Sequence, residues 1–222
     1  HTGAKNRGVF PRGAGRGLGG RRAMTRTAFN RLKFLVIDDN AHMRRIVRQL
    51  LHGFGSREIF EAEDGAAGLD IFTAQKPDIV ITDWAMPLFD GIEFTLAVRK
   101  SESPITRFVP IIMLSGHSEK RRVIEARDAG VTEFLTKPIA AKSLYERILS
   151  VVLAPRPFIR TKDYFGPDRR RTMNAKYTGP ERRKGTSGAE IIEVAPIDNR
   201  LHQQRNKNSG DAQSAPRPNP AA

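Results

Sequence analysis

Four stretches rich in strand-forming residues each end in a side chain that could do chemistry. Asp38 and Asp39 follow the first stretch, Asp83 ends the second, Ser115 ends the third and Lys137 follows the fourth. Strands this apolar have both faces covered, as in a parallel sheet. The carboxyl ends of parallel strands share one edge, where open α/β sheets place their ligands. We therefore expect three acids, a hydroxyl and a lysine to meet at one site.

The adjacent acids Asp38 and Asp39 need a counter-charge, because neighbouring carboxylates repel each other. A hard divalent cation such as Mg²⁺ is the usual one. Taken alone, the pair is explained about as well by a solvated acidic turn that caps the next helix. Asp83, at the end of a second strand of the same build, favours the metal site.

Segments with helical spacing alternate with these strands. Apolar residues from Met43 to Leu51 recur at the three-and-four spacing of an amphipathic helix, which Gly55 closes. A short strand is expected at 59–62, and further helices are expected at about 65–75, 92–100 and 119–128. A final helix contains Leu144, Ile148, Leu149 and Val152 and ends before Pro155, which cannot continue it. Five strands alternating with five helices predict an α/β domain with a doubly wound, five-stranded parallel sheet.

The positive charge of the chain lies in its flanks. The formal net charge is +14, and it divides into nine Lys/Arg and no acids in residues 1–33, fifteen against seventeen in residues 34–153, and fourteen against seven in residues 154–222. The middle is therefore a mildly acidic domain, and the net charge of the whole chain does not by itself indicate a nucleic-acid-binding protein.

Composition also excludes several classes of protein. The chain has no Cys, which rules out disulfides and thiolate metal sites and fits a reducing compartment. No apolar run approaches the roughly 20 residues that span a bilayer, and the start lacks the apolar core of a secretory signal. We expect a cytoplasmic protein that is not transmembrane. Residues 1–31 are expected to be disordered. Met24 is the expected natural start, and residues 1–23 are then a cloning remnant or the translation of a misassigned upstream reading frame.

An internal repeat follows Pro155. Its first copy runs from Tyr164 to Arg171 and its second from Tyr177 to Lys184, and both read aromatic, any residue, Gly, Pro, acid, Arg, Arg, base. The simpler interpretation is a disordered polybasic tail attracted to nucleic acid or an acidic membrane. Such a tail needs only charge, however, and gains nothing from a duplicated Gly-Pro turn with an acid inside each basic cluster.

The repeat suits a compact purine ligand that carries two phosphates. Arginine forks pair with guanine and with phosphates, tyrosine and arginine planes stack on bases, and a carboxylate could accept from the guanine N–H groups. The candidate ligand-binding residues are Tyr164, Asp168, Arg169, Arg170, Arg171, Tyr177, Glu181, Arg182 and Arg183.

Residues 32–153 resemble a response-regulator receiver domain of the chemotaxis-regulator type, which has a flavodoxin-like fold. The resemblance implies that Asp83 is the phosphoacceptor and that Ser115 and Lys137 contact the phosphoryl group. It implies that Mg²⁺ is held by Asp38, Asp39, Asp83 and the backbone carbonyl of Ala85. It also implies a cis bond between Lys137 and Pro138. The switch aromatic position, often Tyr, is Phe134, which cannot donate a hydroxyl hydrogen bond.

Residues 154–185 are similar to the arginine-rich extension of CheY-like cyclic-di-GMP effectors of alphaproteobacteria. That resemblance implies cyclic di-GMP as effector ligand and a flagellar motor switch protein as partner, in control of motility and surface attachment. A PilZ domain is disfavoured, because the required Asp-x-Ser-x-x-Gly does not follow the arginines. Residues 186–222 are expected to form a disordered tail.

The sequence thus predicts a non-enzymatic signalling protein that receives a phosphoryl group from a histidine kinase or phosphotransfer protein. The alternative is a stand-alone chemotaxis or phosphorelay receiver whose polybasic tail binds nucleic acid or membrane. A transcriptional regulator is disfavoured, because the sequence shows no folded DNA-binding domain.

Overall fold

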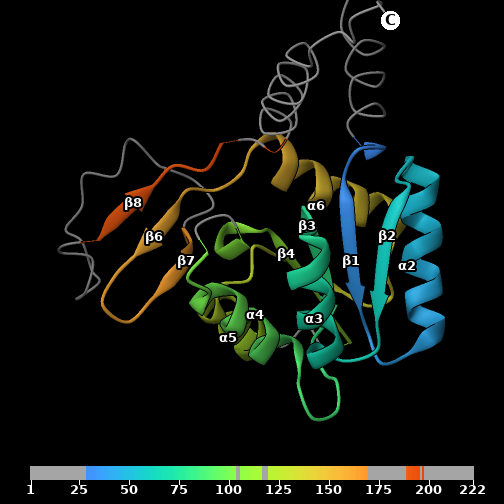
Figure 1. Cartoon of the computed structure of the whole chain (residues 1–222), viewed down its shortest axis with the longest axis horizontal. Helices are drawn as coiled ribbons and strands as arrows, with labels where there is room; N and C mark the ends of the chain where they lie inside the picture. The colour runs from blue at the N-terminus through green and yellow to red at the C-terminus, as the bar shows by residue number, and fades with distance from the viewer. Residues whose placement is uncertain (1–28, 104–105, 117–119, 170–188, 196, 198–222) are drawn as a thin grey trace, which may run out of the picture.

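The computed structural model describes residues 29–103, 106–116, 120–169, 189–195 and 197. A five-stranded sheet lies at its centre (Figure 1), with the strands in the order β2-β1-β3-β4-β5 and every pair parallel. The strands are β1 (Lys33–Ile37), β2 (Glu58–Ala62), β3 (Ile79–Asp83), β4 (Ile111–Ser115) and β5 (Glu133–Thr136). All residues of β3 and β4 are buried. The predicted doubly wound parallel fold is confirmed.

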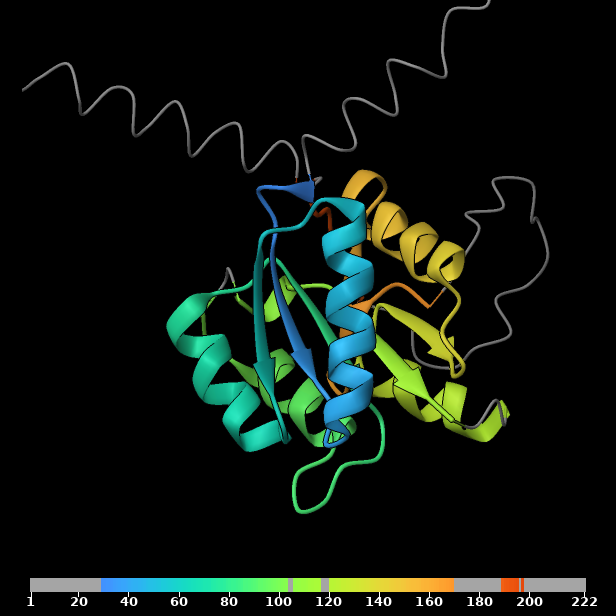
Figure 2. The same cartoon turned by 90° about the vertical axis from the view of Figure 1, so that its right-hand side faces the viewer.

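Helices cover both faces of this sheet (Figure 2). They are α2 (Ala41–Phe54), α3 (Gly65–Gln75), α4 (Gly91–Lys100), α5 (Lys120–Ala129) and α6 (Ala141–Leu153), and a 3₁₀ turn, η1 (Thr106–Phe108), precedes β4. Helices α2 and α6 share a core with Val36 of β1, whereas α3 and α4 share a second core with Leu35 of the same strand. The two faces therefore follow from the alternation of side chains along each strand.

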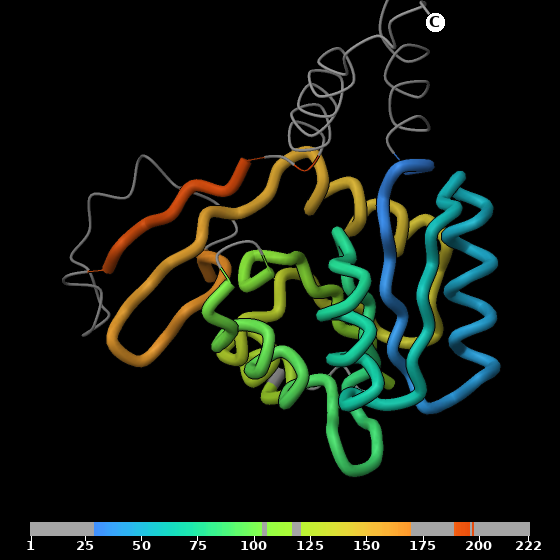
Figure 3. The backbone as a smooth tube through the Cα atoms, in the orientation of Figure 1, coloured from blue at the N-terminus to red at the C-terminus, as the bar shows by residue number. Residues whose placement is uncertain are grey.

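A second, three-stranded sheet follows α6, and it was not predicted. Its strands are β6 (Phe158–Arg160), β7 (Phe165–Pro167) and β8 (Glu190–Ile192), antiparallel in the order β7-β6-β8. Figure 3 shows the three strands side by side, beyond α4 and α5. The prediction of disorder from residue 186 onward is therefore wrong for Glu190–Ile192, because the backbone groups of this segment pair with β6.

Two further residues from the flanks lie in the main core. Phe29 is 1% exposed and Ile197 is 2% exposed, and both belong to the cluster that α2 and α6 form with the sheet. Phe29 stacks on Tyr145 with the ring centroids 5.4 Å apart. The expected disorder of residues 1–31 is thus wrong for Phe29, whose burial removes a large apolar surface from water.

The second sheet is attached to the elements of the main sheet by aromatic contacts and ion pairs. Phe108 of η1 packs edge-on against Phe158 and Phe165, with centroids 4.9 and 5.4 Å away. Glu133, at the start of β5, pairs with Arg156 at 2.6 Å and with Arg147 of α6 at 3.1 Å. We call residues 156–169 and 189–195 the folded extension. In the described part of the chain, no helix has the length and apolar character required to cross a membrane.

Candidate functional site

The strand ends bring the predicted site residues to one edge of the sheet. Ile37 of β1 pairs with Thr82 of β3, so the residues after each of them, Asp38 and Asp83, lie side by side. Ser115 of β4 pairs with Thr136 of β5, which places Lys137 directly beyond that pair. The site is therefore built from the carboxyl ends of four strands, as predicted for a parallel sheet.

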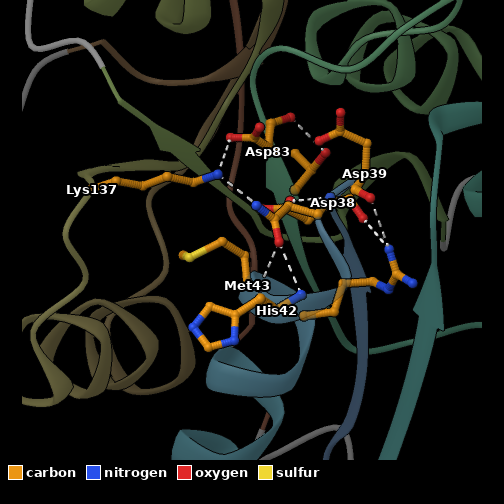
Figure 4. Close-up of polar contacts among 9 residues, drawn as sticks. Asp38, Asp39, His42, Met43, Asp83 and Lys137 are labelled. Atoms are coloured by element: carbon orange, nitrogen blue, oxygen red, sulfur yellow. Dashed lines mark hydrogen bonds and ion pairs between the residues drawn. The ribbon is translucent and has the colours of Figure 1, made fainter.

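The ammonium group of Lys137 joins two of the carboxylates (Figure 4). Its Nζ lies 2.9 Å from Asp38 Oδ2 and 2.9 Å from Asp83 Oδ1. Burial raises the pKa of Asp83, although its hydrogen bond to Lys137 acts in the opposite direction. Burial by itself lowers the pKa of Lys137, but the hydrogen bonds to Asp83 and Asp38 outweigh it and the net shift is upward. Lys137 is therefore a fixed positive charge at neutral pH.

The three acids fit a hard metal ion. Asp38, Asp39 and Asp83 each offer one carboxylate oxygen, and these oxygens all lie within 4.8 Å of one another. An all-oxygen set of carboxylates suits Mg²⁺, which keeps several of its own waters. Asp38 and Asp83 are buried and Asp39 is exposed, so the cluster opens to solvent on one side. Ala85 is exposed and lies between the buried Trp84 and Met86 after β3, and its role as a carbonyl ligand stays a prediction.

Two residues that the sequence analysis did not assign to the site hold Asp38 in place. The backbone N–H of Asn40 donates to Asp38 Oδ1 at 2.9 Å, and the Asn40 side chain caps α2 by accepting from the N–H groups of His42 and Met43. Arg44 Nη1 donates to the carbonyl oxygen of Asp38 at 2.6 Å. An Asn directly before an amphipathic helix is an N-cap signal that could have been used. Arg44 carries no comparable local signal.

The residue after the predicted phosphoacceptor connects the site to α5. Trp84 is 7% exposed, and its ring meets Phe134 edge-on at 6.3 Å between centroids. The guanidinium of Arg122 lies 5.6 Å from the Trp84 ring centroid. Ser115 is buried, and its carbonyl oxygen accepts from the Lys137 N–H at 2.7 Å. The bond between Lys137 and Pro138 is cis, which confirms the prediction.

The backbone around Asp83 requires a glycine at position 91. A Cβ built on Gly91 would meet the carbonyl oxygen of Asp83 at a distance that no folded protein tolerates. The carbonyl of Trp84 also accepts a hydrogen bond from the Gly91 N–H at 3.1 Å. The turn between β3 and α4 is thus folded tightly against the end of β3, which fixes the position of Asp83.

Titration with MgCl₂ is expected to change the fluorescence of Trp84, the only tryptophan of the chain, with a saturating dependence on metal concentration. Asp39→Asn should weaken the binding of Mg²⁺ roughly tenfold or more, because it removes one charged oxygen ligand from an exposed position. Asp70→Asn, an exposed substitution on α3, serves as the matched control and should bind Mg²⁺ like the wild type. Equal Mg²⁺ affinities for all three proteins would argue against the acidic cluster as the metal site.

The arginine repeat is described only in its first copy, and only in part. Tyr164 and Arg169 lie together, with the guanidinium 4.1 Å from the ring centroid. Asp168 is 7% exposed, so a ligand would reach its carboxylate only after a rearrangement. The remaining candidate ligand residues lie outside the described residues: Arg170, Arg171, Tyr177, Glu181, Arg182 and Arg183. Their proposed role stays a prediction.

Comparisons with known proteins agree with this geometry. The chain is 36% identical over 117 residues to the chemotaxis protein CheY of Pseudomonas aeruginosa, a match that covers 53% of this chain and 93% of that protein. It is 35% identical to CheY-3 of Vibrio cholerae over 53% of this chain and 88% of that protein. The structure of V. cholerae CheY4 superposes with a TM-score of 0.51 at 31% identity, covering 54% of this chain and 98% of CheY4.

The family profile of the response regulator receiver domain matches residues 34–149. This range contains the five strands of the parallel sheet apart from Lys33 at the start of β1, together with the acidic cluster and Lys137. It ends before the folded extension. Because the profile accounts for more than half of the chain and the site residues converge inside it, the chain belongs to the response regulator receiver family.

Proposed function

We propose that this protein is a non-enzymatic phosphoreceiver that accepts a phosphoryl group on Asp83 from a histidine kinase or phosphotransfer protein. The observation that carries the proposal is the contact of one ammonium with two buried carboxylates beside a third. Lys137 Nζ lies 2.9 Å from both Asp38 and Asp83, and Asp39 completes the group of three acids. A structural ion pair would need only one acid for one lysine.

The chemistry assigned to Asp83 is an in-line displacement at phosphorus. A carboxylate oxygen of Asp83 forms the new P–O bond, while the bond from phosphorus to the donor nitrogen or acyl oxygen breaks and its electron pair leaves with the donor. A bound Mg²⁺ supplies charge neutralisation for the phosphoryl oxygens. Asp38 and Asp39 would hold the Mg²⁺ ion, and Lys137 pairs with Asp83 and then with the phosphoryl group.

Incubation with acetyl phosphate and Mg²⁺ tests the proposal directly. The wild-type chain should gain the mass of one phosphoryl group, as measured by intact-protein mass spectrometry. A chain that gains none under conditions in which the P. aeruginosa CheY relative is modified would be a receiver in fold only.

The extension is assigned a second input, the binding of cyclic di-GMP. Two observations support this assignment. The repeat carries seven Lys/Arg against two acids in residues 164–184, and its first copy places the Arg169 guanidinium over the Tyr164 ring, an arrangement suited to phosphates and bases. The named relatives are chemotaxis proteins, which favours a flagellar motor component as the partner that reads the liganded state.

Calorimetric titration of the full chain with cyclic di-GMP should give saturable binding. The double variant Arg169→Ala/Arg182→Ala should bind at least tenfold more weakly, because each arginine offers a charge-assisted pair. The control Lys142→Ala/Lys162→Ala removes the same charge from two exposed positions outside the repeats and should leave the affinity unchanged. Equal affinity for GMP or RNA, with a steep loss of binding in salt, would favour the polybasic-tail alternative instead.

A further inference from the structure

The first copy of the repeat is attached to the C-terminal end of α5. The Tyr164 hydroxyl donates to the carbonyl oxygens of Pro167, at 2.8 Å, and Arg127, at 3.5 Å. Arg169 Nη2 lies 3.3 Å from Asp128 Oδ1. We name the contacts of Tyr164 with Arg127 and of Arg169 with Asp128 the clasp. Arg127 and Asp128 both lie in the last turn of α5, which ends at Ala129.

The clasp brings two backbones into contact as well. A Cβ built on Gly166 of β7 would lie 2.9 Å from the Cα of Gly130, and one on Gly130 would lie 3.3 Å from the carbonyl oxygen of Phe165. Gly130 has a φ of +98°, a conformation that glycine adopts without strain. The end of α5 therefore receives β7 at a distance that larger residues would prevent.

Arg169 is oriented but incompletely paired in this arrangement. Its guanidinium lies 4.1 Å from the centroid of the Tyr164 ring in a cation–π contact, and one of its nitrogens, Nη2, pairs with Asp128. Its Nε is buried and has no hydrogen-bond partner among the described residues. Asp128 is itself shared, because Arg127 Nε and Nη2 both donate to the same Oδ1 at 3.3 Å. The Asp128 carboxylate thus pairs with only part of the Arg169 guanidinium, and at a long distance, whereas a phosphate could accept from two of its nitrogens at once.

The ion pair is also of the kind that ligands displace. The side chains of Arg169 and Asp128 are 31% and 45% exposed, so water screens their attraction. A phosphate offers more oxygens and more charge than one shared carboxylate oxygen. An acidic ligand of the repeat therefore competes with Asp128 for Arg169.

Resting on the ligand-binding role proposed above, we infer that Asp128 is a built-in competitor that holds Tyr164 and Arg169 of the first copy in their unliganded arrangement. Cyclic di-GMP binding to Arg169 and opening of the clasp are then one event. Ligand binding in this arrangement frees the C-terminal end of α5 from the folded extension.

Opening the clasp acts on a helix that also contacts Trp84, the residue directly after the proposed phosphoacceptor. Arg122 of α5 lies over Trp84, and Ala126 packs in one cluster with Trp84 and Met113. Trp84 directly follows Asp83. Because α5 is held from both sides, its position links the two inputs, and any effect of the ligand on the Asp83 site must be matched by an equal effect of that site on ligand affinity.

Calorimetry on Asp128→Asn tests the clasp. The variant removes the competing carboxylate and should bind cyclic di-GMP about two- to five-fold more tightly than the wild type, as expected for loss of one exposed ion pair. Glu125→Gln is the matched control, because it removes the same charge from an exposed position on the same helix and should leave the affinity within error. Hydrogen exchange at residues 127–130 and 164–169 should be faster in Asp128→Asn, and in the wild type once ligand is added.

The outcomes separate the clasp from ligand binding itself. Saturable heat in all three proteins with equal affinities and unchanged exchange would overturn the clasp and leave the ligand site standing. A rise in affinity that Glu125→Gln reproduces would also overturn it, because general charge would then suffice. Absence of heat in all three proteins would overturn the ligand site and the clasp together, whereas heat in Asp128→Asn alone would support the clasp strongly.

Discussion

Replacing Asp83 with asparagine is expected to abolish phosphorylation of the chain by acetyl phosphate. Asparagine has nearly the same shape and can still accept a hydrogen bond from Lys137, which lies 2.9 Å from Asp83 Oδ1. The fold should therefore persist, but the amide is not a nucleophile toward phosphorus. Intact-protein mass spectrometry should show the added phosphoryl group in the wild type and none in Asp83→Asn.

Two further variants make this result specific to the site. Lys137→Met should slow phosphorylation roughly a hundredfold or more, because it removes a preorganised positive charge where negative charge accumulates. Asp70→Asn, an exposed acid on α3, should be modified at the wild-type rate. Retention of the phosphoryl group by Asp83→Asn would show that another residue is the acceptor and would contradict the assignment.

The site could be predicted from the sequence because its geometry is a consequence of strand order. Lys137 and Asp38 are 99 residues apart, yet their side chains meet at 2.9 Å. Each follows a strand of one parallel sheet, and the carboxyl ends of such strands share an edge whatever the intervening sequence. Local apolar runs and the residue after each run were therefore sufficient to place Asp38, Asp83, Ser115 and Lys137 together.

The folded extension could not be predicted in the same way, because its strands are three residues long and one of them, β8, pairs with a strand much earlier in the chain. Ile191 pairs with Ile159, 32 positions earlier, and neither lies in a segment with clear alternation. Phe29 and Ile197 lie outside the segments whose periodicity indicates a helix or a strand, and only the shape of the core shows that both fit there. Composition reports average polarity, and it does not identify one buried side chain.

The carboxylate of Glu133 is the connection between the sheet, α6 and the folded extension, and Glu133→Ala is expected to destabilise the chain by about 2–4 kcal/mol. The Glu133 side chain is 3% exposed and accepts from Arg147 and Arg156 at 3.1 and 2.6 Å. Its removal leaves two guanidinium groups facing each other without a counter-charge. Arg147 and Arg156 are 36% and 21% exposed, so water solvates part of each guanidinium and the loss of stability stays below that for a fully buried ion pair. Urea unfolding at neutral pH measures the difference.

The comparison with Glu146→Ala decides whether burial is the cause. Glu146 pairs with Lys142 at 3.9 Å, but these side chains are 60% and 87% exposed, so its removal should cost no more than about 0.5 kcal/mol.

Arg156→Met should speed hydrogen exchange in β6 while leaving the main sheet protected, because Arg156 belongs to the extension alone. Arg147→Met should instead speed hydrogen exchange in α6. If Glu133→Ala costs as little as Glu146→Ala, or if Arg156→Met leaves exchange in β6 unchanged, the two ion pairs do not hold the extension to the sheet. The aromatic contacts of Phe108 with Phe158 and Phe165 would then be the principal attachment.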